Sequence, residues 1–372
     1  MPIAMQPVPS ADFLARRANL RETTLERGPR SDALPLAPGE LLLRVDRFAL
    51  TANNITYAVF GDAMAYWSFF PGHGEWGRVP VWGFALVERS AHAGFVPGER
   101  IYGYLPMSTH LLVRPDRVTP RSFVDGVPHR AKLPPVYNQY TRVAADPADG
   151  SDREDAQMLF RPLFATSFLI DDFLADNAFF GANEILVSSA SSKTSLALAF
   201  LLGRNRSGSV RVVGLTSARN RAFVERAGCY DEVVTYDAIA GLPTQVRAVF
   251  VDMAGNGSVV ARVHERFRDQ LAYSCLVGAT HWQDRSGAQE LAGPKPALFF
   301  APDQIRKRSA EWGPGGFEAR LEESWKPFAD AVSQWIEVVH RFGPDAVREA
   351  YLELLAGDTP PDRAYVLSLH AG

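Results

Sequence analysis

The sequence has few cysteines and little net charge of either sign. Its 372 residues include only two cysteines, Cys229 and Cys275. Two cysteines cannot build a disulfide framework, and these two lack the paired spacing of a structural zinc site. The formal net charge is -3, so there is no general excess of positive charge for holding a nucleic-acid backbone. We therefore expect no nucleic-acid partner and a reducing, cytoplasmic setting.

Long apolar runs are also missing. No segment approaches the roughly 20 apolar residues of a membrane-spanning helix. The segment Met1–Ser10 has neither the basic nor the apolar part of a signal peptide. We expect a soluble protein with no membrane partner. Hydrophobic residues make up 47% of the chain, which provides enough material for about two globular domains.

The first part of the chain is rich in predicted strands. Alternating or strongly apolar segments predict strands over residues 39–50, 82–88, 99–104 and 110–115. A short helix is expected after Leu50. The polar stretch Ala144–Asp155 carries several acidic residues around Pro147 and Gly150, so we expect a surface loop or linker there.

Strands and helices alternate in the middle of the chain. Strands are predicted over residues 184–187, 210–215, 230–236, 247–252 and 271–277, and helices over 157–174, 193–202, 218–227 and 259–267. Short connections between alternating elements imply right-handed crossovers and a parallel sheet. Such a sheet binds ligands outside the carboxyl ends of its strands. We predict an α/β cofactor-binding domain of the Rossmann type.

The end of the chain is expected to return to the first region. Apolar residues at roughly helical spacing predict a helix over Phe317–Phe342, and Ala364–Leu369 predicts a final strand. This strand must pair somewhere, and we expect it to pair with the β-rich first region. The predicted limits are 1–158 and 295–372 for a discontinuous first domain and 159–294 for the cofactor-binding domain.

Three segments carry a family resemblance. The segment GELLLRV begins at Gly39, PGERIYGY spans residues 97–104, and FVERAGCYDEVV spans residues 223–234. Together they resemble the medium-chain dehydrogenase/reductase superfamily, in particular its zinc-free quinone and enoyl reductase branch, over most of the chain. The chain is also similar to a divergent bacterial group known as a domain of unknown function. The resemblance implies a Rossmann-type domain inserted in a β-rich, GroES-like substrate domain.

Glycine is absent from the turn where this family is rich in it. The chain has SASSKTS at residues 189–195, at the start of a predicted helix. Hydroxyls, first-turn amides and an ammonium group at a helix N-terminus favour an anion, although larger side chains restrict its approach to the backbone. We predict that a dinucleotide diphosphate binds to Ser189, Ser191, Ser192, Lys193 and Thr194. The alternative is an ordinary helix cap with a solvated lysine.

The second predicted strand of this domain is not followed by an acidic residue. NAD enzymes usually have an Asp or Glu there for the ribose hydroxyls. This chain has Thr216, Ser217, Arg219 and Arg221 instead. Because hydroxyls and guanidiniums suit a 2′-phosphate, we predict NADP(H) rather than NAD. A solvated helix start is the alternative, and it explains Arg221 alone equally well.

Further candidates are expected around the substrate, some placed by the resemblance and some by the unusual segment LPPVYNQY at residues 133–140. The catalytic candidates are Tyr57, Asn54 and Tyr137, with Tyr57 donating a proton or orienting a carbonyl. The substrate-binding candidates are Asn53, Asn138, Tyr140 and Arg161. The alternative for Tyr57 is a packed surface residue, and the alternative for Arg161 is a structural ion pair. For Tyr137, Asn138 and Tyr140 the alternative is that they only hold their inserted segment in place instead of lining the cleft. No metal is expected, because asparagine cannot replace the metal-binding cysteine of zinc-dependent relatives and residues 82–88 contain no His-Glu pair.

Together these features predict an NADP-dependent, zinc-free oxidoreductase. It is expected to transfer hydride to an activated C=C or C=O of a small organic substrate such as an enone, an enoyl thioester or a quinone. The resemblance implies a homodimer. Two alternatives remain open. One is an enzyme with the same fold but without hydride transfer, such as a lyase or a coenzyme A thioester-binding enzyme, and the missing glycines motivate it. The other is a non-catalytic nucleotide-binding sensor.

Overall fold

The computed structural model describes residues 6–143, 151–205, 210–253, 255–277 and 291–372. The chain divides into two compact units. Unit 1 contains Met1–Leu159 and Glu337–Gly372, and unit 2 contains Phe160–Ile336. Within the described ranges, no helix has both the length and the apolar character needed to cross a membrane.

Unit 1 is built on two β-sheets. The smaller sheet has the order β2-β1-β4, with β1 at Pro9–Arg16, β2 at Asn19–Arg30 and β4 at Trp76–Gly77. The larger sheet has the order β17-β18-β3-β5-β6-β10-β9-β8, with β7 beside β3. Its strands are β3 (Leu41–Leu50), β5 (Pro80–Ser90), β6 (Arg100–Pro106), β7 (His110–Val113), β8 (Pro115–Asp116), β9 (Ser122–Asp125), β10 (Gln139–Val143), β17 (Glu337–Phe342) and β18 (Arg363–Ser368).

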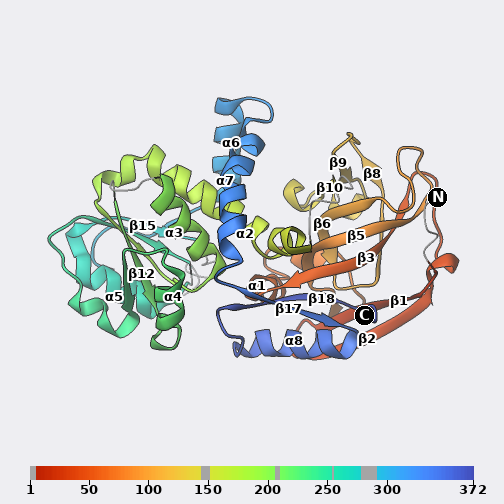
Figure 1. The fold of residues 1–372 in the computed structure, drawn as a ribbon, viewed down its shortest axis with the longest axis horizontal. Coiled ribbons are helices and arrows are strands. Elements are labelled where there is room, and N and C mark those ends of the chain that lie inside the picture. Colours follow the sequence, from red (N-terminus) through yellow and green to blue (C-terminus); the bar gives the residue numbers. More distant parts are fainter. Residues whose placement is uncertain (1–5, 144–150, 206–209, 254, 278–290) are drawn as a thin grey trace. The chain divides into compact units, whose positions relative to one another are not determined.

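The end of the chain joins the larger sheet of unit 1. Strand β18 is antiparallel to β3, with Val366 opposite Ala49, which confirms the expected return of the final strand. Figure 1 shows these blue C-terminal strands beside the orange-red β3. The predicted helix over Phe317–Phe342 is wrong at its end, because β17 is a strand parallel to β18. Sheet pairing overrides the local helical spacing there.

Two helices cover the sheets of unit 1. They are α1 (Ala52–Val59) and α8 (Pro344–Ala356). In α8, Val347, Ala350 and Tyr351 are completely buried, at the spacing that places residues on one helix face. The ring of Tyr351 lies 5.4 Å from that of Phe13 between ring centres. The ribbon of β1 and β2 and the C-terminal helix therefore share one core.

Unit 2 contains a parallel sheet of order β13-β12-β11-β14-β15-β16. The strands are β11 (Glu184–Val187), β12 (Arg211–Thr216), β13 (Glu232–Thr235), β14 (Ala248–Asp252), β15 (Leu271–Leu276) and β16 (Ala297–Leu298). The connecting helices are α3 (Lys193–Asn205), α4 (Arg221–Ala227) and α5 (Gly257–Phe267). Every residue of β11 and β14 is buried, as in parallel sheets covered on both faces. The strand order reverses between β11 and β14, which is where such sheets bind ligands.

Three further helices account for the boundaries of unit 2. They are α2 (Ser151–Asp176), α6 (Ala301–Trp312) and α7 (Gly316–Val332). Ring centres of Phe164 lie 5.3 Å from Trp325 and 5.0 Å from Phe328, and Arg308 pairs with Asp172 at 2.6 Å. These contacts hold α6 and α7 in unit 2, so the chain returns to unit 1 at Glu337 instead of residue 295.

The acidic stretch before α2 differs from the expectation. Residues 144–150 lie outside the described residues, but the remainder of the predicted loop, from Ser151 to Asp155, is the first part of α2. Asp155 is only 2% exposed.

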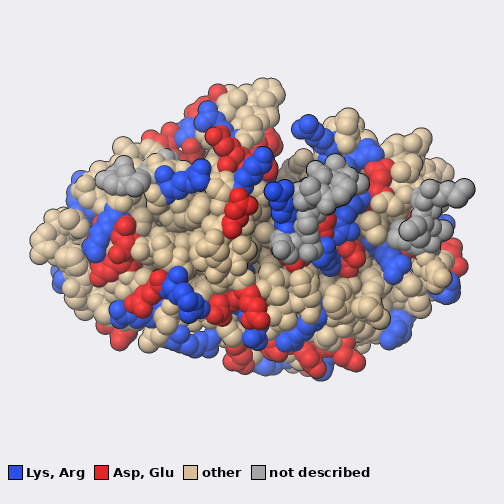
Figure 2. Space-filling model, in the orientation of Figure 1, with Lys and Arg blue, Asp and Glu red and all other residues tan. Residues whose placement is uncertain are grey.

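On the face of the molecule in Figure 2, basic and acidic side chains are interspersed, in keeping with the net charge of -3.

Candidate functional site

The turn between β11 and α3 keeps a glycine-type backbone without a glycine. Ser189 has a φ of 49°, in the left-handed region that glycine adopts most easily. The hydroxyl of Ser188, which is completely buried, donates to Asp252 Oδ1 at 2.6 Å and accepts from the Met253 amide at 2.9 Å. These bonds anchor the turn to the end of β14, beside the point where the strand order reverses.

Two hydroxyls of the turn have roles inside the protein. Ser192 Oγ accepts from the Ser195 amide at 3.1 Å and therefore caps α3. Ser191 Oγ accepts from Asn220 Nδ2 at 2.9 Å. The hydroxyls of Ser191 and Ser192 therefore shape the turn, as in the alternative interpretation of an ordinary helix cap.

Three backbone amides at this turn remain open. Among the described residues, the amides of Ser191, Lys193 and Thr194 have no hydrogen-bond acceptor. Open amides at a helix N-terminus carry the positive end of the helix dipole and bind anions. Lys193 is half-buried, and this loss of solvent lowers its pKa to about 8. The turn can therefore bind an oxyanion through backbone N–H groups and a nearby ammonium group.

The predicted 2′-phosphate residues lie at the end of β12. Thr216 is 1% exposed and Ser217 is half-buried, whereas Arg219 and Arg221 are exposed in and after the short helix η6 (Ala218–Asn220). Arg221 Nε pairs with Glu225 Oε1 at 2.7 Å. An exposed ion pair of this kind is weak in water, so it does not hold the guanidinium away from a ligand.

Two tyrosines missed by the sequence analysis close part of the turn. The hydroxyl of Tyr236 accepts from the Ser189 amide at 3.1 Å, and that of Tyr230 donates to the Ala190 carbonyl at 2.9 Å. The Tyr230 ring also lies 2.9 Å from where a side chain at Gly214 would begin. The Ser189 amide is thus used internally. The only sequence signal for these bonds is a hydroxyl-bearing side chain at each end of a predicted strand.

An aromatic cluster in unit 1 gathers four phenol groups. Its tyrosines are Tyr57 on α1, Tyr66 on the short helix η2 (Tyr66–Ser68), Tyr104 on β6 and Tyr137 on the short helix η4 (Pro135–Tyr137). Ring centres of Tyr57 and Tyr66 are 4.5 Å apart, and those of Tyr104 and Tyr137 are 4.7 Å apart. The hydroxyls of Tyr66 and Tyr137 are 3.5 Å apart.

Burial keeps these phenols protonated. It raises the pKa of Tyr57 to about 12 and the pKa of Tyr104 and Tyr137 well above the ordinary value. They can therefore donate hydrogen bonds at neutral pH but cannot act as bases. The buried hydroxyl of Tyr104 has no partner among the described residues, which is rare for a buried polar atom and marks this cluster as a candidate substrate site.

The two asparagines of α1 have different roles. Asn54 is 3% exposed; its Oδ1 accepts from the Thr51 amide at 2.8 Å, and its Nδ2 donates to the Pro80 carbonyl at 3.0 Å. It therefore fixes the start of α1, with both polar atoms of its side chain bonded within the protein. Asn53 is half-buried and precedes Tyr57 by about one helical turn, so the two residues lie on the same face of α1.

The structure ties Asn138 and Tyr140 to a buried arginine. Arg130 is 1% exposed, pairs with Asp125 at 3.1 Å and donates to the Phe69 carbonyl at 2.9 Å and the Tyr140 hydroxyl at 3.1 Å. Asn138 Nδ2 donates to the Arg130 carbonyl at 3.1 Å. The structure thus favours the structural alternative, in which Asn138 and Tyr140 hold their own segment of the chain in place next to the phenol cluster.

Arg161 is engaged within unit 2. Its guanidinium pairs with Glu322 at 2.8 Å and lies 5.3 Å from the centre of the Trp325 ring. These contacts connect α2 with α7. The arrangement matches the structural ion pair that was the alternative to a substrate contact.

Comparisons with known proteins agree with this architecture. A family model described as "Protein of unknown function (DUF2855)" matches residues 48–360. No curated protein matches the chain in sequence. The structure of CurA from Vibrio vulnificus in complex with NADPH is similar, with 14% identity and a TM-score of 0.59 over 97% of this chain and 100% of that chain.

Two further structures are also similar. A mutant of an enoyl thioester reductase from Candida tropicalis has 10% identity and a TM-score of 0.57, covering 97% of this chain and 99% of that one. An Etr1p mutant in complex with NADP and crotonyl-CoA has 10% identity and a TM-score of 0.58, covering 97% and 100%. Identities this low concern the fold alone, and the predicted fold class is confirmed.

Proposed function

We propose that this chain, which belongs to the DUF2855 family of proteins of unknown function, is an NADP(H)-dependent reductase. Its substrate is a small organic molecule with an activated C=C or C=O group, such as an enone, an enoyl thioester or a quinone. The observation that carries the proposal is the open N-terminus of α3, where three free amides and Lys193 stand at the switch point of a parallel sheet.

The residues around β11 and β12 fit a phosphorylated dinucleotide. The amides of Ser191, Lys193 and Thr194 are positioned to hold the diphosphate, with the Lys193 ammonium adding charge. Ser217 and Arg219, with Arg221 released from its exposed ion pair, would hold a 2′-phosphate. Bound there, NADPH supplies the hydride. Similar structures with NADPH or NADP bound support this choice of cofactor.

The phenol cluster of unit 1 is the proposed substrate site. Tyr57 donates a hydrogen bond to the carbonyl oxygen of the substrate and, after reduction, a proton. Its raised pKa of about 12 keeps that proton in place at neutral pH. Asn53, on the same face of α1 as Tyr57, supplies an amide to the substrate, and Tyr137 contributes a second phenol. The aromatic surroundings exclude water and favour a planar, apolar acceptor group.

We extend the proposal to zinc independence, a cytoplasmic setting and a homodimer. Asn53 and Asn54 are found near the position where zinc-dependent relatives place a cysteine ligand. Cys229 and Cys275 are both free thiols, and burial raises the pKa of each to about 12, which keeps them unreactive.

A second candidate function has one observation in its favour. The hydroxyl of Tyr236 already occupies the Ser189 amide, and the hydroxyls of Ser191 and Ser192 are bonded within the protein. A dinucleotide would have less backbone to bind than in a glycine-rich turn. This favours an enzyme that keeps the fold without hydride transfer, for example on a coenzyme A thioester, or a nucleotide-binding sensor.

The test is a fluorescence titration of the full chain with NADPH and with NADH. We expect NADPH to bind at least about tenfold more tightly, because a charge-assisted phosphate contact contributes on the order of 1.5–3 kcal/mol. Lys193→Met should weaken NADPH binding by about tenfold or more. Lys295→Met, at an exposed lysine of the same unit, is the matched control and should leave it unchanged.

Turnover separates the two candidate functions. NADPH oxidation is followed with crotonyl-CoA, an enone and a benzoquinone as acceptors. Consumption of NADPH with any of them supports the reductase. NADPH binding without consumption supports the sensor, and crotonyl-CoA binding without NADPH binding supports the non-redox enzyme.

A further inference from the structure

Unit 1 contains a cavity of about 410 Å³ that the proposed function leaves unused. We call it the Arg44 pocket. The lining residues that matter here are Arg44 on β3, Leu86 on β5, His340 and Phe342 on β17, Val366 on β18 and His370 after β18. The volume falls in the range of about 300–1,000 Å³ that is typical of small-molecule sites. Its walls combine apolar side chains with a few polar ones, as in such sites.

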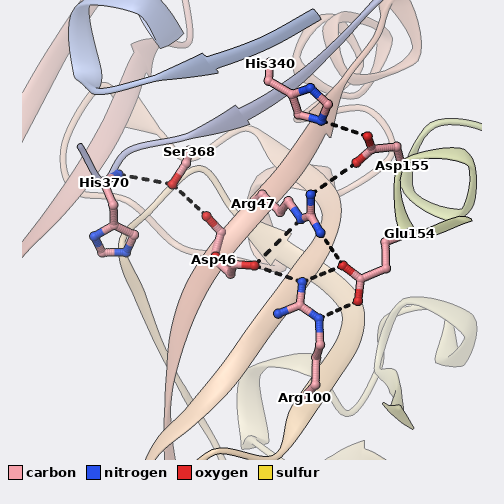
Figure 3. Close-up of polar contacts among 8 residues, drawn as sticks. All are labelled: Asp46, Arg47, Arg100, Glu154, Asp155, His340, Ser368 and His370. Atoms are coloured by element: carbon pink, nitrogen blue, oxygen red, sulfur yellow. Dashed lines mark hydrogen bonds and ion pairs between the residues drawn. The ribbon is translucent and has the colours of Figure 1, made fainter. Parts of the chain in front are cut away.

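One side of the pocket is an ion-pair network whose charges are already paired. Arg47 Nη2 contacts Glu154 at 2.6 Å, and Arg100 Nη2 contacts Asp46 at 2.8 Å. His340 Nε2 lies 2.7 Å from the carboxylate of Asp155, which also pairs with Arg47 at 3.5 Å. Figure 3 shows these side chains joined in a continuous chain of contacts from Asp46 to His340. Their function is to hold β3, β6, β17 and the start of α2 together.

Arg44 stands apart from this network. Among the described residues its guanidinium has no carboxylate within ion-pair distance, and its one hydrogen bond is a long contact of 3.5 Å to the Gln6 carbonyl. The residue is half-buried. A partly desolvated guanidinium without a counter-ion is unfavourable, and guanidinium geometry matches carboxylates and phosphates. The pocket therefore has an unneutralised positive charge in its wall.

His370 provides a second unsatisfied group. Its Nε2 atom is buried without a hydrogen-bond partner among the described residues. In Figure 3 its ring makes none of the marked contacts, and only its backbone amide bonds to Ser368 Oγ, at 3.2 Å. Loss of solvent, the charge of Arg44 and the neighbouring His110 lower the pKa of His370. The ring is therefore neutral at physiological pH and able to accept a proton when an anion binds.

We propose that the Arg44 pocket binds a small organic oxyanion, with Arg44 and His370 contacting the charged group and Leu86, Phe342 and Val366 contacting a short apolar part. The oxyanion is a carboxylate or a phosphate ester. The negative charges of Asp46 and Asp155 act against the binding of an anion. Their bonds to guanidiniums and to His340 reduce their repulsion of an anion.

The pocket is separate from the proposed cofactor site, so the two proposals fail independently. The Arg44 pocket is lined by residues of unit 1 alone, whereas the open amides lie in unit 2. Binding to the pocket is measured without NADPH, by calorimetry on the full chain and by the ring ¹⁵N shifts of its histidines. The probes are butyrate and benzoate for carboxylates, methyl phosphate for phosphate esters, and butyramide as a neutral match for butyrate.

We expect at least one of the anions to bind and to shift the ring nitrogens of His370, while butyramide does not bind. Whichever anion binds more tightly identifies the ligand class. Arg44→Met should weaken binding by about tenfold or more, because a charge-assisted bond is lost. Arg44→Lys keeps the charge and should weaken it less. Arg27→Met, at an exposed arginine on β2 of the same unit, is the matched control and should change nothing.

Three results would each overturn the proposal. They are no binding of any anion at millimolar concentration, equal binding of butyrate and butyramide, and unchanged binding in Arg44→Met. Thermal unfolding of each variant shows whether it is folded. If Arg44→Met does not fold, the comparison of Arg44→Lys with the unchanged protein decides, since loss of the planar guanidinium alone should weaken binding measurably.

Discussion

The polar turn of unit 2 and the phenol cluster of unit 1 are assembled in opposite ways. The turn takes its groups from one short stretch, Ser189 to Thr194, whereas the cluster takes its four phenols from four separate segments. The same physical cause acts on both. Loss of solvent lowers the pKa of Lys193 to about 8 and raises that of Tyr57 to about 12. One site therefore titrates near physiological pH, and the other does not.

The comparison also shows how each site is supported. Several separate hydrogen bonds hold the turn, some between neighbours, such as Ser192 with Ser195, and some to distant segments, such as Ser188 with Asp252. The phenol cluster rests on the buried Arg130, which pairs with Asp125 and donates to the carbonyl of Phe69 in a distant segment of the chain. Replacement of Arg130 should therefore lower the stability of the protein more than a single substitution in the turn.

Removal of Arg130 is the largest expected effect. Arg130→Leu leaves the carboxylate of Asp125 buried without its counter-ion, and breaking a buried pair in this way costs about 3–5 kcal/mol. Unit 1 should unfold at a lower urea concentration, as measured by tryptophan fluorescence. Arg121→Leu, at an exposed arginine of the same loop region, should have little effect. A midpoint equal to that of the unchanged protein would contradict the supporting role of Arg130.

Removal of the Tyr57 hydroxyl should have the next largest effect. Tyr57→Phe removes the proposed proton donor while keeping the ring packing, so turnover should fall by roughly 10²-fold or more. NADPH binding should stay unchanged, because Tyr57 is in unit 1 and the proposed cofactor residues are in unit 2. Steady-state kinetics with the active acceptor measures this. Full activity of the variant would contradict this role of Tyr57 and indicate that Tyr66, Tyr104 or Tyr137 donates the proton.

The pH dependence of NADPH binding sharpens the contrast between the sites. The ammonium form of Lys193 predominates below its pKa of about 8, so affinity should be constant below neutral pH and fall as the pH rises through 8. The fall approaches at most about tenfold per pH unit, because one proton is involved. In Lys193→Arg the charge persists at all these pH values, and affinity should remain level. Titrations from pH 7 to 9.5 check this, and a fall in both proteins would assign the dependence elsewhere.

Removal of Arg221, one of the exposed arginines after β12, should have the smallest effect. Arg221→Ala loses a weak surface ion pair with Glu225 and one possible contact to the 2′-phosphate. We expect NADPH affinity to fall by less than about threefold, since an exposed contact is screened by solvent. NADH affinity should not change. A loss as large as that in Lys193→Met would make Arg221 a main phosphate ligand.

The parallel sheet of unit 2 is the part that the sequence predicted best. Strand β11 has the predicted bounds, Glu184–Val187. Strands β14 and β15 differ from the prediction by one residue at one end, and β12 is shifted by one residue at both ends. Buried strands and helices with short connections leave a local apolar pattern that can be read without knowing what they pack against. The candidate turn was found for the same reason, because its groups are consecutive.

Elements that depend on distant partners were missed or misassigned. Strand β17 was read as helix, because only its pairing with β18 makes it a strand. Helix α8 and the ribbon of β1 and β2 were not predicted at all, although they share one core. The sequence leaves open whether Asn138 and Tyr140 line a cleft or hold their segment in place, and only the structure shows that both are bonded to Arg130.

By itself, the sequence determined the class of fold, the parallel sheet and the polar turn at the start of α3, because each depends on residues close together in the chain. Only the tertiary structure decided which phenols meet, that Asn54 is a helix cap, and that Arg44 and His370 line one cavity. The reason is that solvent exclusion and charge pairing depend on distances in space. Residues such as Arg44 and His370, more than three hundred positions apart, acquire a shared environment only on folding.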